Sequence, residues 1–367
     1  MTWRPFRSAV VLVVAVLLTG AARAKPPVSL SLPAPTGPQP IGTFEMHLVD
    51  HGRTDPWATP PGAPRELMVS VWYPAQAGAD SPRAPHFPTG VAAHYDQSSG
   101  AFGIRPGTVD FAGSRTHATE RAAVAPDATG LPVVLYSPGG GLSRAMGTTL
   151  VEELASRGYV VVTVDHTFAA PVQFPGRMQL PAPDLDKARM LQEQVRDIRF
   201  VLDELTQVAA GTDPDAQRRG LPAGLPAALD LSRIGMFGHS AGGFTAAETM
   251  LDEDRIDAGA NLDGSMDPRY GRASTRGVDR PFLLMGGGTS GDDANPHHHL
   301  AAPDWNAFWE HSTAWKRDVY LRTAEHMSFA DQQVLLPQID RELPLPDGVL
   351  DELVGTIDPV RSIAAQR

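Results

Sequence analysis

The sequence predicts an α/β fold: a mostly parallel, doubly wound sheet with an antiparallel pair of strands at its N-terminal edge. From Leu131 onward, short apolar runs alternate with amphipathic helical segments, the pattern of parallel strands joined by crossover helices. Upstream, two strand-like segments, 41–49 and 66–73, are separated by a Pro/Gly/Asp-rich connection. A chain of 367 residues with 42% hydrophobic content is long enough to bury one large core.

The elements of the predicted core follow one another in a regular order. The predicted strands are short and apolar, and they are 132–137, 159–164, 234–237, 256–262, 281–285 and 318–321. The predicted helices are 143–157, which Gly158 ends, 185–208, which has Gly211 just beyond it, and 303–315. In the second helix the apolar residues step by three and four, so one face is expected to be buried.

The first 24 residues are predicted to be a secretory signal peptide. Arg4 and Arg7 precede an uncharged apolar run, 9–18, and Ala22-Arg23-Ala24 has the A-x-A pattern of a cleavage site. An uncleaved membrane anchor is the alternative, but the run is short for a bilayer. We therefore expect cleavage after Ala24, no membrane span afterwards, and a periplasmic or secreted protein.

The rest of the chain is expected to form one catalytic domain, 41–367, behind an extended Pro-rich leader, 25–40. Within the domain we expect edge strands and loops over 41–130 and a catalytic core over 131–340. Two segments with little periodicity are expected to shape the substrate cleft, mainly as loops: 74–130 and 168–183.

The composition argues against several classes of function. A net charge of −11 argues against nucleic acid or an anionic membrane surface as the main partner. The chain has no Cys, which excludes disulfides, a thiol nucleophile and a thiolate metal site.

Ser240 is the predicted nucleophile. It lies in Gly238-His239-Ser240-Ala241-Gly242, between an apolar strand and an Ala-rich helix, a turn that exposes the serine hydroxyl. The two flanking glycines are expected to prevent a clash where strand and helix cross closely. The five-residue pattern is weak alone, and the flanking elements make it specific.

A nucleophilic serine needs a general base, usually histidine, and the base needs an orienting acid. Such residues gather at the carboxyl ends of the strands in a doubly wound sheet. Asp263 directly follows the strand 256–262 and is the predicted acid, with Asp292 and Asp293 as the alternative pair. His326 follows the last predicted strand and is the predicted base. The chain order of serine, aspartate and histidine is the one expected for a serine hydrolase on such a sheet.

The other histidines are given lesser roles. His239 is expected to line or pack beside the site, and His166 follows a strand on the same edge, with a direct catalytic role as a minor alternative. The run 297–299 has no acidic or Cys partner at metal-ligand spacing, so a solvated loop is expected rather than a metal site. The predicted chemistry uses no metal and no cofactor.

The predicted oxyanion hole has two backbone donors. One is the N–H of Ala241, directly after the nucleophile. The other is the N–H of Gly140, in the Gly-rich loop that follows strand 132–137. A flexible loop or a phosphate cradle is the alternative for this loop, but no Gly-Lys-Ser/Thr follows it, which argues against a nucleotide site.

At these positions the sequence resembles the secreted platelet-activating factor acetylhydrolase family of α/β-hydrolases and its bacterial esterase and lipase relatives. The matching stretches are 136–144, 164–166, 231–243, 261–264 and 325–331. The resemblance implies an α/β-hydrolase fold, the acid at Asp263 and the oxyanion donor at Gly140. Better-known members of the family have His where Pro138 stands and a larger residue where Gly140 stands, so the resemblance does not extend to acyl-chain specificity.

We therefore expect a serine carboxylic-ester hydrolase that acts through an acyl-enzyme on short- to medium-chain esters or, as the resemblance implies, on short-acyl phospholipids. A catalytic triad does not select the leaving group, so a polyester hydrolase or a serine peptidase stays open as an alternative. A non-catalytic exported binding protein is the alternative from another class. Such proteins usually lose a member of the triad, and all three candidates are present here.

Overall fold

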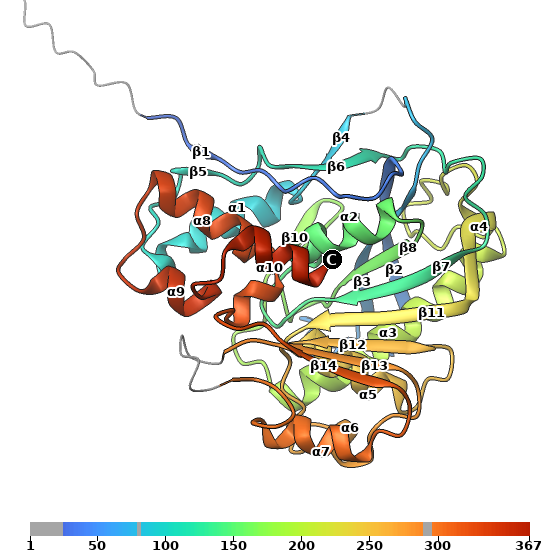
Figure 1. The fold of residues 1–367 in the computed structure, drawn as a ribbon. Helices are drawn as coiled ribbons and strands as arrows, with labels where there is room; N and C mark the ends of the chain where they lie inside the picture. The colour runs from blue at the N-terminus through green and yellow to red at the C-terminus, as the bar shows by residue number, and fades with distance from the viewer. Residues whose placement is uncertain (1–24, 79–81, 289–295) are drawn as a thin grey trace, which may run out of the picture.

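The computed structural model describes residues 25–78, 82–288 and 296–367, and its centre is a twisted sheet (Figure 1). Among the described residues this sheet has ten strands in the order β14-β13-β12-β11-β7-β8-β3-β2-β6-β4. In chain order they are β2 (Ile41–Thr54), β3 (Pro64–Pro74), β4 (Arg83–Pro85), β6 (Arg115–Glu120), β7 (Leu131–Ser137), β8 (Val160–Asp165), β11 (Leu229–His239), β12 (Ala258–Leu262), β13 (Phe282–Gly286) and β14 (Lys316–Tyr320).

The strands from β14 to β8 run parallel, and β3 pairs antiparallel with both β8 and β2. The predicted antiparallel pair is therefore present, but it does not form the edge of the sheet. Strand β6 adds parallel to β2, and β4 adds antiparallel to β6. Both extra strands come from 74–130, which was expected to form mainly loops.

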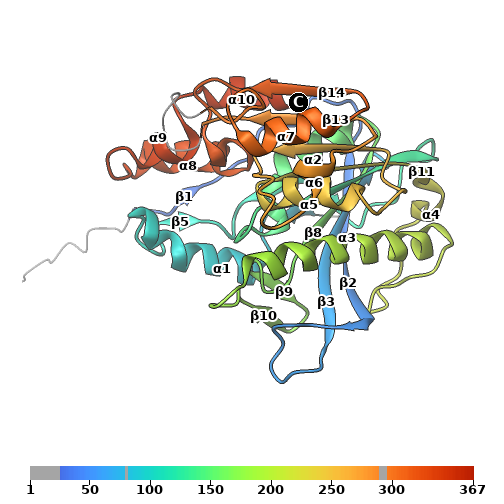
Figure 2. The same ribbon diagram turned by 90° about the horizontal axis from the view of Figure 1, so that it is seen from below.

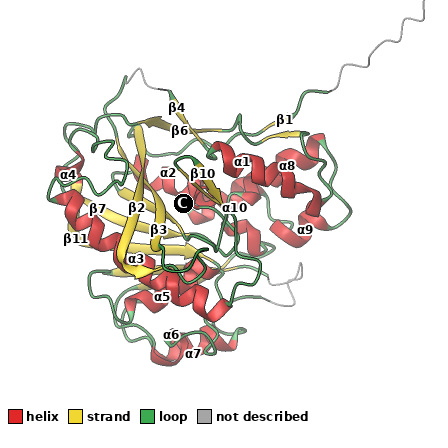
Figure 3. Ribbon diagram, turned by 180° about the vertical axis from the view of Figure 1, so that it is seen from behind, coloured by secondary structure: helices red, strands yellow, loops and turns green. Residues whose placement is uncertain are grey.

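Helices cover both faces of the sheet, as Figure 3 shows from behind. On one face, α3 (Lys187–Ala209) and α5 (Ala241–Met250) pack against the strands and against each other. On the other face, α2 (Thr148–Ser156) buries Val151 and Ala155 in a second cluster. Shorter helices complete the domain: α4 (Leu225–Ala228), α6 (Ala273–Arg276) and α7 (Pro303–His311).

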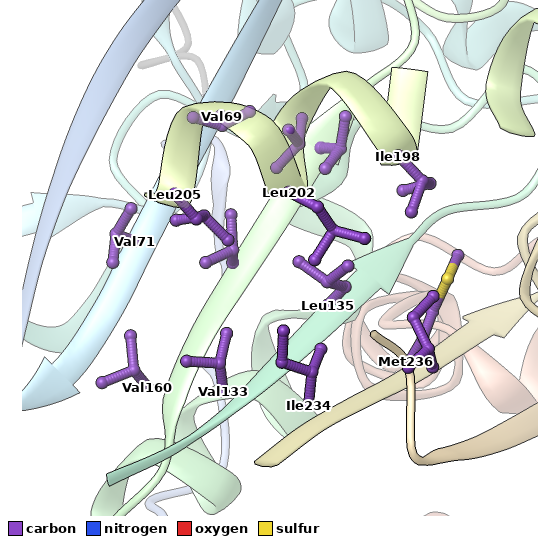
Figure 4. Packing of buried hydrophobic residues seen from close by; sticks show 14 of the residues in the cluster. Val69, Val71, Val133, Leu135, Val160, Ile198, Leu202, Leu205, Ile234 and Met236 are labelled. Carbon is purple, nitrogen blue, oxygen red and sulfur yellow. The ribbon is translucent and has the colours of Figure 1, made fainter. Parts of the chain in front are cut away.

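Helix α3 illustrates how the sequence pattern becomes packing, and Figure 2 shows it crossing the sheet. The Asp186 side chain accepts a hydrogen bond from the Arg189 N–H and caps its N-terminus. Ile198, Leu202 and Leu205 are fully buried against the strands, as the close view in Figure 4 shows. This is the apolar face predicted for 185–208, and it packs α3 against the buried side chains of β7, β8 and β11.

Two other predicted segments differ from the structure. The expected helix 143–157 is a short 3₁₀ turn, η2 (Arg144–Gly147), followed by α2. The loop expected over 168–183 contains a small hairpin of β9 (Val172–Phe174) and β10 (Arg177–Gln179). Its proline content hid the short pairing, because prolines usually interrupt a strand.

The Pro-rich leader and the C-terminal helices pack together beside the sheet (Figure 1). Strand β1 (Val28–Ser29) pairs with β5 (Val109–Asp110), and Leu30 and Leu32 are buried in the same apolar cluster. The helical elements of this region are α1 (Thr89–Ser98), η1 (Ser99–Phe102), η3 (His326–Phe329), α8 (Gln332–Glu342), α9 (Val349–Val354) and α10 (Pro359–Gln366). The predicted signal peptide, 1–24, lies outside the described residues. Among the helices that are described, none has the length and apolarity needed to cross a membrane.

Candidate active site

Ser240 occupies a sharp turn between β11 and α5. Its backbone has φ 55° and ψ −119°, a strained conformation for a residue with a side chain. A Cβ atom on Gly238 would lie 2.2 Å from the carbonyl carbon of Gly242, and one on Gly242 would lie 1.9 Å from the Ser137 oxygen. The close strand–helix crossing expected from the sequence is present, and it leaves room only for glycine at both positions.

Ser240, His326 and Asp263 form one hydrogen-bonded chain. The Ser240 Oγ atom lies 3.0 Å from His326 Nε2, and His326 Nδ1 lies 2.6 Å from Asp263 Oδ2. Asp263 directly follows β12, and His326 opens η3 shortly after β14. The three residues predicted from the sequence are thus brought together at the carboxyl ends of the strands.

The backbone around Asp263 is held by side chains outside this chain of residues. The Asn261 amide bonds both the N–H and the carbonyl of Gly264 at 2.7 Å, and the Trp305 indole donates to the same carbonyl at 2.8 Å. Asp263 itself has φ 57° and is only 2% exposed. Its carboxylate is therefore fixed in a defined orientation toward His326.

The second oxygen of the Asp263 carboxylate also has partners. The Gly287 N–H donates to Oδ1 at 3.0 Å, and His297 Nδ1 lies 2.9 Å from the same atom. Burial by itself would raise the pKa of Asp263, but the hydrogen bonds and charge interactions with His297 and His326 outweigh it and lower the pKa to about 2. The acid is thus ionised throughout the neutral range.

His297 is the residue of this site that the sequence analysis missed. The expectation of a solvated histidine run is wrong: His297 is 7% exposed, and its ring lies 4.0 Å from the Trp305 ring. His299 is also engaged, with Nδ1 2.6 Å from Asp318 Oδ2. The position of His297 after a strand of the same sheet was the only sequence signal available. No group of three or more potential metal ligands occurs in the part of the chain that the structure describes.

The alternative acids, Asp292 and Asp293, lie outside the described residues. The other two candidate histidines are described. Burial lowers the pKa of His239 to about 3, and its Nε2 donates to the His326 carbonyl oxygen at 2.9 Å. His239 therefore packs beside the site, as expected. His166 bonds Ser137 and Asp197 and makes no hydrogen bond to Ser240.

The two predicted oxyanion donors flank Ser240. Gly140 and Ala241 line the same cavity as the serine. Within the described residues, neither backbone N–H has a hydrogen-bond partner in the protein, whereas the Gly141 N–H donates to the Ala169 carbonyl at 2.8 Å. Free backbone donors beside a nucleophile are one requirement of an oxyanion hole.

The cavity beside Ser240 has a volume of about 230 Å³. Its wall is mainly apolar and comes from the start of α3, from α5 and from the loop after β12. The side chains that form it are Leu185, Lys187, Met190, Leu191, Phe244, Ser265 and Tyr270. None of them lies in 74–130 or 168–183, so the expectation that those segments line the cleft is wrong for this cavity.

Comparisons with known proteins find relatives of this chain among esterases. Residues 30–172 match the family model for platelet-activating factor acetylhydrolase, isoform II. An Arthroderma benhamiae protein described as a probable 1-alkyl-2-acetylglycerophosphocholine esterase is 27% identical over 96% of this chain and 89% of its own length. The chain belongs to the platelet-activating factor acetylhydrolase family of α/β-hydrolases and their esterase relatives.

Two further proteins are similar to this chain. The platelet-activating factor acetylhydrolase of Gallus gallus is 23% identical over 63% of this chain and 58% of its own length. A ferulic acid esterase from Streptomyces cinnamoneus superposes with a TM-score of 0.72 and 34% identity, over 92% of this chain and 90% of that one. The protein has the α/β-hydrolase fold and is a carboxylesterase-type hydrolase.

Proposed function

We propose that this hydrolase is a serine esterase in which Ser240 is the nucleophile, His326 the general base and Asp263 the orienting acid. The observation that carries the proposal is the continuous hydrogen-bonded chain from Ser240 Oγ through the His326 ring to Asp263. His326 Nε2 takes the hydroxyl proton as Oγ attacks the ester carbonyl. Asp263 holds Nδ1–H toward itself, which selects the tautomer and stabilises the charge that forms on the ring.

The tetrahedral intermediate is stabilised by the backbone N–H groups of Gly140 and Ala241. Their lack of protein acceptors among the described residues leaves both free for the developing oxyanion. Collapse of the intermediate expels the alcohol, which receives its proton from His326, and leaves the acyl group on Ser240. Water then attacks along the same path and releases the acid. No cofactor or metal takes part.

The cavity beside Ser240 supports an acyl group of small or medium size. A mainly apolar cavity of about 230 Å³ directly beside the nucleophile suits a short to medium aliphatic chain. The names of the relatives include an esterase of an acetylated glycerophosphocholine, which also carries a short acyl group. We therefore place short- and medium-chain esters, including short-acyl phospholipids, first among the substrates.

Esters of a compact aromatic acid are the second candidate. Phe244 and Tyr270 line the cavity, and aromatic side chains stack favourably on an aromatic acyl group. The ferulic acid esterase of Streptomyces cinnamoneus, which matches over nearly the whole chain, is named for the ester of such an acid.

We also propose that the protein is exported and that residues 41–367 form the single catalytic domain. The charged and apolar pattern of the first 24 residues supports a cleavable signal peptide. A periplasmic or secreted esterase would meet its substrate outside the cytoplasm.

The substrate proposal is tested with mature protein on a panel of p-nitrophenyl acetate, butyrate, octanoate and palmitate, methyl ferulate and a phospholipid with an sn-2 acetyl group. A p-nitroanilide and a polyester film test for peptidase and polyester hydrolase activity. We expect the highest kcat/KM on acetate to octanoate or on methyl ferulate, and none on palmitate. A preference for palmitate, the anilide or the film would contradict the proposal, and Ser240→Ala serves as the blank.

A further inference from the structure

The protein contains a second Ser–His–Asp chain, which is sealed inside the fold. Ser137 Oγ lies 2.9 Å from His166 Nε2, and His166 Nδ1 lies 3.0 Å from Asp197 Oδ2. Ser137, His166 and Asp197 are each at most 1% exposed. No substrate can reach this serine, so the arrangement is not a second active site. Its function must lie in what it holds in place.

At the Asp197 end, this series of hydrogen bonds is anchored by a buried guanidinium group. Arg65, at the start of β3 and 1% exposed, donates from Nη2 and Nε to the two oxygens of Asp197 at 2.6 and 3.1 Å. Burial alone would raise the pKa of Asp197, but Arg65 and His166 hold it well below its usual range. An ionised Asp197 accepts a hydrogen bond from His166 Nδ1–H, and His166 Nε2 is hydrogen-bonded to the Ser137 hydroxyl. Every polar atom along the chain then has a partner.

At its other end, this series of hydrogen bonds reaches the oxyanion loop through Ser137. Ser137 is the last residue of β7, and Pro138, Gly139 and Gly140 follow it directly. Three consecutive glycines, 139–141, have little conformational preference of their own, so their orientation depends on contacts outside the loop. An oxyanion donor has to lie within about 2.7–3.1 Å of the developing charge, which requires such contacts to be rigid.

The turn 166–170 contacts the loop on both sides of Gly140. Before Gly140, the His166 ring holds the Ser137 side chain. After Gly140, the Gly141 N–H donates to the Ala169 carbonyl at 2.8 Å. The Ala169 N–H in turn donates to the His166 carbonyl at 3.0 Å, so the two contacts belong to one rigid turn.

Arg65 also fixes that turn directly. Its Nη1 donates to the Thr167 carbonyl at 2.9 Å and to Asp55 at 2.7 Å. One side chain therefore fixes the turn through its backbone and, by way of Asp197, through the His166 ring. The turn cannot move without breaking hydrogen bonds that are buried away from water, which is costly.

We propose that Ser137, His166, Asp197 and Arg65 form a positioning network that holds the Gly140 N–H at the distance the oxyanion requires. The network touches neither substrate nor reacting atoms and acts through the loop. This inference rests on the proposed function, in which Gly140 is an oxyanion donor. A displacement of about 1 Å in such a group can cost roughly 100-fold in rate, so loss of the network affects kcat more than KM.

The test compares Ser137→Ala with Ser114→Ala. Ser114 is a matched control, because it is also buried and its hydroxyl bonds a buried histidine, His86, at 3.2 Å. We expect Ser137→Ala to lower kcat on p-nitrophenyl butyrate roughly 10- to 100-fold with KM within about 2-fold. Its affinity for a trifluoromethyl ketone, whose adduct with Ser240 carries an oxyanion, should fall by a similar factor. Ser114→Ala should change neither quantity.

A double-mutant cycle with His166→Leu separates positioning from general destabilisation. In the His166→Leu background, Ser137→Ala should have no further effect on kcat, because the hydrogen bond is already lost. If Ser137→Ala does not fold, the near-isosteric Ser137→Cys replaces it, with a smaller loss of the same kind. Unchanged kcat and ketone affinity in a folded Ser137 variant, or additive effects in the cycle, would overturn the inference. An active Ser240→Ala enzyme would instead overturn the proposed function.

Discussion

His297 Nδ1 lies 2.9 Å from Asp263 Oδ1, on the carboxylate whose other oxygen is 2.6 Å from His326 Nδ1. The Asp263 carboxylate therefore lies between two imidazole rings, and the Gly287 N–H adds a further donor. His297 is itself fixed, because its backbone N–H donates to the Gly287 carbonyl at 2.7 Å and its ring packs on Trp305. This arrangement limits how far the carboxylate can rotate away from His326.

Replacing His297 by Phe should test this arrangement. The Phe ring can keep the contact with Trp305, but it removes the donor to Asp263 Oδ1. We expect kcat to fall roughly 10-fold while KM stays within about 2-fold, because the lost interaction orients the triad and does not bind substrate. His298→Phe is the control, since His298 packs on Tyr320 and makes no contact with Asp263. Equal effects of the two substitutions on kcat would contradict this account.

The ionisation of Asp263 should contribute to stability in a pH-dependent way. Its pKa of about 2 in the folded protein lies below the value of 3.8 for an unperturbed aspartate, so the stabilisation is present above about pH 4 and is lost as the pH falls toward 2. The difference corresponds to about 2 kcal/mol. The gap in free energy of unfolding between wild type and Asp263→Asn should shrink by about this amount from pH 5 to pH 2, measured by urea denaturation. A gap that is constant with pH, or an equal change for the exposed Asp254→Asn, would argue against it.

The glycines around the nucleophile should differ sharply in their tolerance of a methyl group. A Cβ on Gly242 would lie 1.9 Å from the Ser137 oxygen, whereas the nearest atom to a Cβ on Gly140 is Met190 Cε at 3.9 Å. Gly242→Ala should destabilise the protein by about 1–3 kcal/mol and abolish most esterase activity. Gly140→Ala should have a melting temperature close to that of the wild type. Similar melting temperatures for the two variants would show that the strand–helix crossing is looser than described.

Met190 should control the length of acyl chain that the enzyme accepts. It is 7% exposed and lines the cavity beside Ser240. Met190→Ala lengthens the apolar space, so the ratio of kcat/KM for octanoate over acetate should rise roughly 10-fold. Leu300→Ala, at a residue that is 79% exposed, should leave the ratio unchanged. If the ratio of kcat/KM for octanoate over acetate is unchanged in Met190→Ala, the acyl group does not bind in the cavity that Met190 lines.

The sequence predicted the catalytic half of the fold well because its strands are uniformly apolar. The predicted strand 132–137 became β7 (Leu131–Ser137), and 159–164 became β8 (Val160–Asp165). Strand β6 was missed because its sequence, RTHATE, is polar although Thr116 and Ala118 are buried. Thr116 and Ala118 are buried because β6 lies between β2 and β4 in the sheet, a position that the polar composition of the segment does not indicate.

The candidate triad could be predicted from the sequence because its members follow successive strands in a characteristic order. Ser240, Asp263 and His326 each follow a strand in the expected succession, and the structure brings them into one hydrogen-bonded chain. His297 was not predicted, because its contact with Asp263 depends on the Gly287 carbonyl and the Trp305 ring, which come together only through tertiary packing. The buried chain from Ser137 to Arg65 was missed for the same reason, since its members come from distant parts of the sequence.

The central claim, that Ser240 is the nucleophile, is tested most directly by labelling mature protein with a fluorophosphonate and locating the adduct by mass spectrometry. We predict one adduct per chain on the peptide that contains Ser240, with loss of esterase activity in proportion to labelling. Ser240→Ala should not be labelled, and His326→Ala should be labelled far more slowly, because the hydroxyl then lacks its base. An adduct on another residue, or full hydrolysis of p-nitrophenyl butyrate by Ser240→Ala, would contradict the account.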